Sequence, residues 1–219
     1  MIITIDGPAG SGKSTAARKL AARLEIPYLD TGAMYRAIAL KALNEKIDLR
    51  DDEALVRIAR TARIELDCAS THTRVILDGH DVSESIRTIE VNEATGYVAR
   101  NPAIRKILIE KQREIAARLG SVVTEGRDQG AVVFPDADVK FVLEASLEKR
   151  AERRYTEMIA DGQDVTLERV RDNLSRRDSN DRSQWAPLLQ SGRAVCIDTT
   201  NMTLAAVVDR LYEEVQRRR

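Results

Sequence analysis

The sequence is poor in the residues that mark disulfide-rich, metal-binding and membrane proteins. Its 219 residues include two cysteines, two histidines and one tryptophan, and aromatic residues make up 4%. Cys68 and Cys196 lie far apart and form neither a metal-ligand nor a redox spacing. No apolar run approaches the ~20 residues that a membrane helix requires. A cysteine-based scaffold and a membrane-spanning protein are therefore excluded.

The chain also lacks an excess of charge of either sign. The 35 basic and 35 acidic side chains balance, so no global field draws the protein onto nucleic acid or a membrane surface. The start "MIITIDGPAG" has neither the basic residues nor the long apolar stretch of a secretory signal. No helix pattern shows a second apolar stripe. We expect a cytoplasmic monomer that binds small molecules and has no nucleic-acid or membrane partner.

Apolar strands and amphipathic helices alternate along most of the chain. Helical patterns with apolar residues at i, i+3, i+4 and i+7 separate most of the strands. Because the strands are apolar on both faces, the alternation predicts an α/β fold with a parallel sheet between helices. The predicted strands are residues 2–5, 27–30, 121–125, 139–145 and 194–198.

Two segments interrupt this alternation. Residues 63–82 form short β-rich runs with the hairpin signal Asp78-Gly79, which predicts a small antiparallel insertion. Residues 147–183 are helical, rich in arginine and poor in apolar residues, so we expect a loosely packed lid that moves. We expect one domain over residues 1–219, with a core at 1–62, 101–146 and 184–219, an insertion at about 63–100 and a lid at about 147–183.

The segment "GPAGSGKST" follows the first strand at once and opens the first helix. It fits the phosphate-binding pattern G-x-x-x-x-G-K-[ST] with Gly7, Gly12, Lys13 and Ser14. Small residues let backbone N–H groups converge on a phosphate at the helix N-terminus. Lys13 would reach the β- and γ-phosphates of ATP, and the Ser14 hydroxyl would ligate Mg²⁺. The predicted ATP-binding residues are Gly7, Pro8, Ala9, Gly10, Ser11, Gly12, Lys13, Ser14 and Thr15.

Three classes of nucleotide-binding protein share such a phosphate cradle. A GTP-dependent switch would need an N-K-x-D segment to read guanine, and the sequence has none. A motor-like ATPase usually carries four apolar residues ending in aspartate, whereas the nearest segment, "VVTE" at residues 122–125, ends in glutamate and continues into arginine. A kinase that phosphorylates a small molecule is therefore favoured. Such a kinase needs a second anion site opposite the cradle.

Arginines in separate parts of the chain are candidates for that second site. Arginine binds phosphate through two parallel hydrogen bonds and keeps its charge when desolvated. Arg36 stands in "DTGAMYR", and others stand in "KRAERR" and "RRDSND". A solvated surface arginine is the alternative interpretation for each. This alternative has the least support at Arg127, because the loop "EGRD" that carries this arginine follows a buried strand. The adjacent Asp128 either orients Arg127 or accepts a hydrogen bond from an exocyclic amine.

On these residues the chain resembles the bacterial cytidylate (CMP) kinases, which are P-loop nucleoside monophosphate kinases. The matching segments occur in family order over the whole chain. "EGRDQGAVVFPDA" and "DGHDVSESIR" are more specific than the cradle, because adenylate and guanylate kinases lack them. The segments are "ITIDGPAGSGKST", "LDTGAMYR", "LDGHDVSESIRTIEV", "NPAIR", "EGRDQGAVVFPDADVKF", "RAERR", "RRDSND" and "AP".

The resemblance implies a five-stranded parallel sheet flanked by helices, an acceptor-binding region that includes the β insertion, and a lid over ATP. It implies transfer of a phosphoryl group from Mg·ATP to CMP or dCMP. The implied roles are cytosine reading by Thr31, Arg105 and Asp128, acceptor-phosphate binding by Arg36, Arg127 and Arg177, sugar contact by Asp181, donor-phosphate bridging by Lys13, and stabilisation of the transferred phosphoryl by Arg150, Arg153 and Arg154.

Two positions depart from the pattern of the resembled family. Gly96 stands where the family often has serine, and Gln184 stands where it often has arginine. These changes concern contacts with the base and the sugar rather than the reaction. A kinase for shikimate or UMP on the same core is the alternative activity. A nucleotide-dependent regulatory module is the alternative outside enzymes.

Overall fold

The chain forms two compact units in the computed structural model. The model describes residues 1–70, 73–160, 162–190 and 192–218, except for the side chains of residue 177 and residues 179–185. The first unit contains Met1–Glu25 and Val123–Arg219, and the second contains Ile26–Val122. The insertion that the sequence predicts at about 63–100 lies inside the second unit. Within the described residues, no helix combines the length and the apolar character needed to cross a bilayer.

A five-stranded sheet has the order β2-β6-β1-β7-β8. Its strands are β1 (Ile2–Asp6), β2 (Tyr28–Leu29), β6 (Val122–Glu125), β7 (Val139–Glu144) and β8 (Val195–Asp198). β1 pairs in parallel with β7, with Ile3 opposite Val139, and β7 pairs in parallel with β8. β1, β6 and β7 are buried along nearly their whole length. The predicted α/β fold is confirmed, and all five strands lie where their apolar runs placed them.

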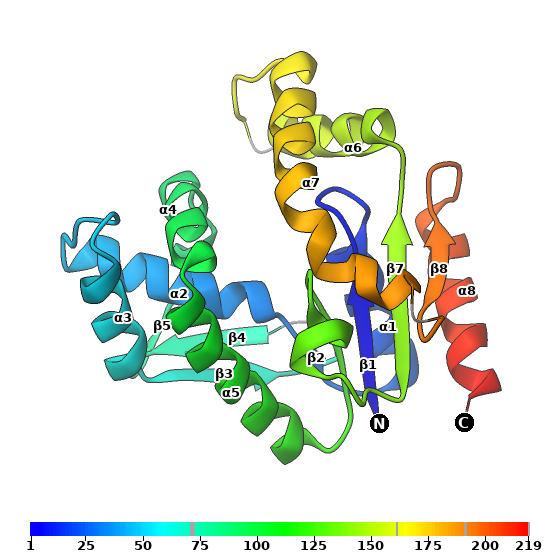
Figure 1. Cartoon of the computed structure of the whole chain (residues 1–219), viewed down its shortest axis with the longest axis horizontal. Coiled ribbons are helices and arrows are strands. Elements are labelled where there is room, and N and C mark those ends of the chain that lie inside the picture. Colours follow the sequence, from blue (N-terminus) through cyan, green and yellow to red (C-terminus); the bar gives the residue numbers. More distant parts are fainter. Residues whose placement is uncertain (71–72, 161, 191, 219) are drawn as a thin grey trace. The chain divides into compact units, whose positions relative to one another are not determined.

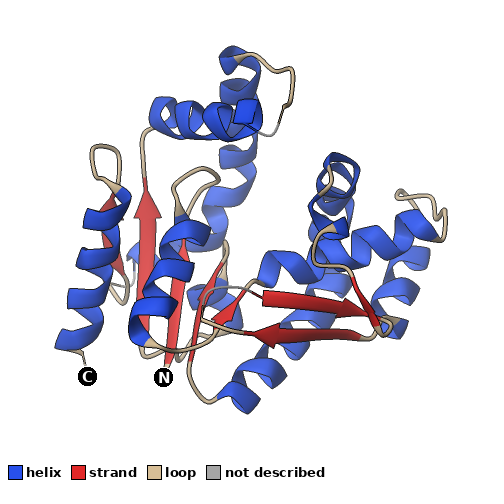
Figure 2. Ribbon diagram, turned by 180° about the vertical axis from the view of Figure 1, so that it is seen from behind, coloured by secondary structure: helices blue, strands red, loops and turns tan. Residues whose placement is uncertain are grey.

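Helices cover both faces of the sheet in the first unit (Figures 1 and 2). α1 and α8 pack against each other on one face, and the C-terminal part of α7 lies on the other. α8 begins as the sequence predicts, because the Thr203 hydroxyl accepts a hydrogen bond from Ala206 N at 3.2 Å. The helices are α1 (Lys13–Leu24), α6 (Leu147–Ala160), α7 (Leu167–Gln190), α8 (Leu204–Arg217) and the short π-helix η2 (Gln129–Val133).

The helices α6 and α7 form the segment that the sequence predicts as a lid. They share a small apolar cluster of Ala151, Val170 and Leu174, and the half-buried Ala9 of the cradle packs against this cluster. α7 is continuous to Gln190 and so runs past residue 183, where the lid was predicted to end. The helices of the predicted lid are therefore attached to the predicted phosphate-binding loop by apolar packing.

The second unit combines four helices with an antiparallel sheet of order β3-β4-β5. α2 packs against α4 and α3 packs against α5. Asp78 and Gly79 both have positive φ, 51° and 86°, and they join β4 to β5 in a two-residue turn. Both angles are those of the hairpin turn that Asp-Gly favours, so the predicted hairpin is confirmed. The elements are α2 (Thr31–Asn44), α3 (Asp52–Thr61), β3 (Ile64–Cys68), β4 (Thr73–Leu77), β5 (His80–Asp81), the 3₁₀ helix η1 (Ser85–Arg87), α4 (Ile89–Arg100) and α5 (Pro102–Leu119).

A buried carboxylate closes β1. Asp6 is fully buried, and its oxygens accept hydrogen bonds from the backbone N–H groups of Gln129 at 2.8 Å and Gly130 at 2.7 Å. Burial raises the pKa of this carboxyl from 3.8 to about 6, although the two backbone hydrogen bonds oppose the rise. The native protein therefore holds the Asp6 proton more tightly than the unfolded chain does.

This difference predicts a pH dependence of stability. Between the unfolded pKa of 3.8 and the folded pKa of about 6, the native state binds more protons, so the contribution of Asp6 to stability falls as pH rises. Relative to Asp6→Asn, which does not titrate, the wild-type protein should lose about 1 kcal/mol of unfolding free energy between pH 5 and pH 7. Urea unfolding of both proteins at several pH values measures this. A constant difference between them would contradict the prediction.

Candidate functional site

The phosphate cradle is the loop between β1 and α1. Gly7 has a φ of 139°, and a Cβ at this residue would lie 2.2 Å from the Leu143 carbonyl oxygen. The loop therefore passes so close to the β7 backbone that only glycine fits. Lys13 is buried, and its ammonium donates a hydrogen bond to the Pro8 carbonyl oxygen at 2.6 Å. The lysine thus lies across the cradle that it is predicted to serve.

The cradle has the polar groups that a nucleotide polyphosphate requires. α1 begins at Lys13, directly after Gly12, and the first backbone N–H groups of any helix have no partner inside the helix. The Ser11 hydroxyl is buried, and its oxygen has no hydrogen-bond partner within the part of the chain that the structure describes. Such a group is costly to leave unsatisfied, so the loop fits a bound oxyanion.

Ser14 and Glu125 together form the candidate Mg²⁺ position. The Ser14 hydroxyl donates a hydrogen bond to Glu125 Oε1 at 2.9 Å, although 111 residues separate the two in sequence. Glu125 ends β6, and its side chain is largely buried. Mg²⁺ prefers oxygen ligands and is commonly held by one or two carboxylates together with substrate phosphates. The sequence analysis set "VVTE" aside because it does not end in aspartate, and so it missed Glu125.

Arg127 and Asp128 lie in the loop that follows β6. This loop is attached to β1, because Gly126 N donates a hydrogen bond to the Ile5 carbonyl oxygen at 3.1 Å. Asp128 is buried, and its carbonyl oxygen accepts from Val132 N at 2.8 Å in the first turn of η2. The structure thus brings the predicted pair to the edge of the sheet that carries the cradle. Ligands of open α/β sheets bind at this edge.

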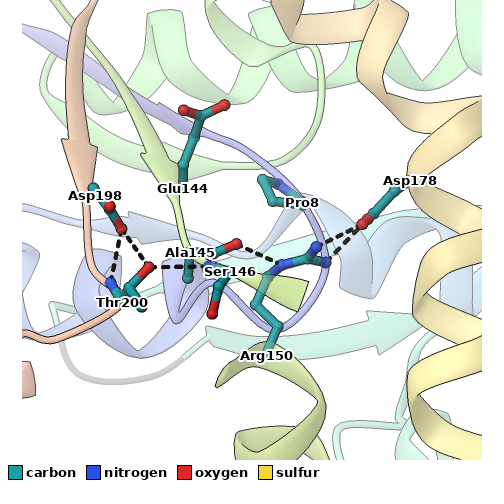
Figure 3. A pocket seen from close by; sticks show the side chains of 8 residues that line it. All are labelled: Pro8, Glu144, Ala145, Ser146, Arg150, Asp178, Asp198 and Thr200. Carbon is teal, nitrogen blue, oxygen red and sulfur yellow. Dashed lines mark hydrogen bonds and ion pairs between the residues drawn. The ribbon is translucent and has the colours of Figure 1, made fainter. Parts of the chain in front are cut away.

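The predicted lid arginines have separate environments. Arg150 is buried and forms a bidentate ion pair with Asp178, at 3.0 and 2.6 Å (Figure 3). Its Nη1 also donates to the Ala9 carbonyl oxygen at 3.2 Å. Arg153 donates to the Thr199 carbonyl oxygen at 2.6 Å. Arg154 pairs with a neighbour on the exposed side of α6. Of the three, Arg150 lies against the cradle. Sequence reasoning missed its partner on α7.

A pocket of about 390 Å³ lies beside the cradle, at the carboxyl ends of β7 and β8 (Figure 3). Its polar groups are held in place by one another. Asp198 Oδ1 accepts from Thr200 N at 2.9 Å, and the Thr200 hydroxyl accepts from Ser146 N at 3.0 Å. The lining residues are Pro8, Glu144, Ala145, Ser146, Arg150, Asp178, Asp198 and Thr200.

In the second unit, two arginines converge on one carboxylate. Arg36 Nη2 donates to both Asp30 oxygens, at 3.2 and 3.0 Å, and Arg87 Nη2 lies 3.4 Å from Asp30 Oδ2. The Arg36 Nε atom is buried and has no hydrogen-bond partner among the described residues. Asp30 also caps α2 through Ala33 N. The sequence analysis named Arg36 but missed Arg87, whose only signal is its place in the segment "SESIR".

The structure describes the side chains of some of the other residues predicted to bind the acceptor. Thr31 is buried at the first position of α2, and Arg105 is half-buried on α5. The side chains of Arg177, Asp181 and Gln184 lie outside the described residues.

The family model and the curated relatives give the same assignment. Residues 3–217 match the family model described as cytidylate kinase. The cytidylate kinase of Caldanaerobacter subterraneus is 49% identical over 98% of this chain and 94% of its own length, and that of Desulforamulus reducens is 46% identical over 98% and 96%. The crystallised shikimate kinase of Acinetobacter baumannii shares the fold, with a TM-score of 0.51 and 15% identity over 99% of this chain and 93% of that one. The chain therefore belongs to the cytidylate kinase family.

Proposed function

We propose that the protein transfers the γ-phosphoryl group of ATP to CMP and to dCMP, giving CDP or dCDP and ADP. The observation that carries this proposal is the attachment of the Arg127–Asp128 loop to β1, the strand that leads into the phosphate cradle. An arginine beside a carboxylate at this edge suits an acceptor with both a phosphate and an exocyclic amine. Membership of the cytidylate kinase family supports the same acceptor.

On the donor side, the cradle residues 7–15 bind the ATP phosphates. Lys13 exchanges its hydrogen bond with the Pro8 carbonyl for bonds to phosphate oxygens, and the helix N-terminus adds partial positive charge. The pocket of about 390 Å³ beside the cradle accommodates the nucleoside of ATP. Its carboxylate, hydroxyl and backbone groups supply hydrogen bonds that fix the orientation of the nucleoside.

Mg²⁺ would be held by the Ser14 hydroxyl, which Glu125 would orient. The Ser14–Glu125 hydrogen bond of 2.9 Å places a hydroxyl and a carboxylate side by side, and such oxygen groups suit a hard divalent cation. The ion would supply positive charge that neutralises the phosphate groups during transfer. Glu125 then keeps the Ser14 oxygen turned towards the phosphates. The carboxylate thus orients the hydroxyl, as outer partners of metal ligands commonly do.

On the acceptor side, charge neutralisation and alignment supply the catalysis. An acceptor monophosphate carries close to two negative charges near neutral pH, and its oxygen attacks directly, so no strong general base is needed. Arg127 grips this phosphate with Arg36 and Arg177, whereas Asp128 accepts from the cytosine amino group. Thr31 and Arg105 complete the reading of the base, and Asp181 contacts the sugar.

The lid arginines Arg150, Arg153 and Arg154 stabilise the transferred phosphoryl group. Arg150 and Arg153 do so only after they give up their hydrogen bonds to Asp178 and Thr199. Closure of α6 and α7 over ATP also excludes water, which would otherwise hydrolyse the nucleotide.

The test of the activity is a coupled assay of ADP release with CMP, dCMP, UMP, AMP and shikimate. CMP and dCMP should react fastest, because a pocket built to hydrogen-bond an exocyclic amine leaves buried groups unpaired when it binds uracil. A higher rate with UMP or shikimate than with CMP would show that the proposed acceptor is wrong. Rapid ATP hydrolysis without any acceptor would favour a nucleotide-dependent regulatory module.

Arg127→Ala should lower kcat/KM for CMP by about 10³-fold, because the variant loses a charged group that neutralises the transferring phosphates. Arg57→Ala removes an exposed arginine from α3 and serves as the matched control. Steady-state kinetics of both variants at saturating ATP measure the effect. A rate with Arg127→Ala within about threefold of wild type would remove Arg127 from the acceptor site.

Glu125→Gln should raise the Mg²⁺ concentration needed for half-maximal rate by about 10- to 100-fold, since residues that orient a metal ligand have effects of this size. The readout is a Mg²⁺ titration of the initial rate, together with calorimetric titration of ATP binding at low and high Mg²⁺. Glu213→Gln on the exposed side of α8 is the control. An unchanged Mg²⁺ requirement would show that Glu125 does not serve the metal.

A further inference from the structure

The loop that carries Arg127 and Asp128 is fastened to β1 on both sides of this pair. On one side, Gly126 N donates to the Ile5 carbonyl oxygen at 3.1 Å. On the other, Gln129 N and Gly130 N donate to the two oxygens of Asp6, at 2.8 and 2.7 Å. Arg127 and Asp128 are therefore held between two anchors on the same strand. The second anchor is a single side chain.

The loop backbone lies directly on β1 at this second anchor. A Cβ at Gly130 would lie 2.7 Å from Thr4 Oγ1 and 3.2 Å from Asp6 Oδ2. The close approach lets both N–H groups reach one carboxylate. A side chain larger than hydrogen at residue 130 would therefore move the loop away from β1.

A carboxylate is the side chain that satisfies this arrangement. When ionised it is an acceptor only, so each oxygen receives one N–H group. An asparagine in the same place would offer one acceptor, and its amide group would face the second N–H. Burial opposes the ionised form and raises the pKa of Asp6 to about 6, so the native state keeps this charge at a cost in stability. Lys13 from α1, Asp128 before η2 and Lys140 from β7 are the charged groups that act on it.

We propose that Asp6 is a positioning residue of the acceptor site, which holds Arg127 and Asp128 in their binding geometry through the backbone of Gln129 and Gly130. The inference rests on the proposed function, in which Arg127 binds the acceptor phosphate and Asp128 the cytosine amino group. Asp6 contacts neither substrate. It acts through the loop, and a bound phosphate or base displaced by a fraction of an ångström loses the alignment on which transfer depends.

Asp6→Asn tests the inference, with Thr4→Val as the matched control. Thr4 lies on the same strand against the same glycine, and its hydroxyl oxygen has no hydrogen-bond partner in the described structure. In Asp6→Asn, KM for CMP should rise about 10-fold or more, the effect of an unsatisfied buried N–H group, while KM for ATP changes less than about threefold. Thr4→Val should leave both constants unchanged. Equal increases in both constants, or an unchanged KM for CMP, would overturn the proposal.

The pH dependence of this effect separates positioning from a general loss of structure. Below pH 6 the wild-type carboxyl takes up a proton and loses one acceptor, so the ratio of KM for CMP in Asp6→Asn to that in wild type should fall towards one between pH 8 and pH 5. Titration of CMP itself occurs in both proteins and cancels in the ratio. A ratio that stays constant over this range would overturn the proposal.

Two further variants keep the outcome decisive. If Asp6→Asn does not fold, as judged by circular dichroism, Gly130→Ala replaces it, because its Cβ would push the loop off Thr4 and Asp6 without changing any charge. The same selective increase in KM for CMP is expected. Arg127→Ala is measured beside them. If Arg127→Ala raises KM for CMP and the loop variants do not, the inference alone fails. If Arg127→Ala has no effect, the proposed acceptor role fails.

Discussion

Parallel pairing of the central strands is the constraint on which the site depends. Parallel strands end at the same edge, and here four of them end in a carboxylate: Asp6, Glu125, Glu144 and Asp198. Acids at a phosphate site would repel the ligand, yet each of these four faces a hydrogen-bond donor of the protein. Asp6 receives two backbone N–H groups, Glu125 the Ser14 hydroxyl, Glu144 the Cys196 thiol and Asp198 the backbone N–H of Thr200. These hydrogen bonds hold the loops of the candidate site in place.

Most of the fold could be predicted from local patterns in the sequence. The five strands, the Asp78-Gly79 hairpin and the Thr203 cap each depend on residues close together in the chain, and the structure confirms them. The partners of the functional side chains depend on tertiary contacts instead. Ser14 meets Glu125 across 111 residues, Arg87 meets Asp30 across 57, and Arg150 meets Asp178 across 28. Periodicity and motif spacing hold no information about such pairs, so they could not be predicted.

The predicted lid arginines also differ in their burial and in their hydrogen-bond partners. The resemblance gave Arg150, Arg153 and Arg154 one shared role, because any guanidinium can bind a phosphate. In the structure Arg150 is a buried connector of α6, α7 and the cradle, Arg153 connects α6 to the loop after β8, and Arg154 is exposed. Because their burial and hydrogen-bond partners differ, these three arginines would need different amounts of free energy to leave their present positions.

Ala9 takes part both in the cradle and in the apolar cluster of α6 and α7. Its backbone lies in the cradle and accepts a hydrogen bond from Arg150, and its methyl group packs into the apolar cluster of α6 and α7. The phosphate-binding pattern allows any residue at this position, but packing against α6 and α7 limits the size of the side chain there. A rearrangement of those helices would therefore act on the cradle through this methyl group, and the predicted lid and the predicted donor site are connected by direct packing.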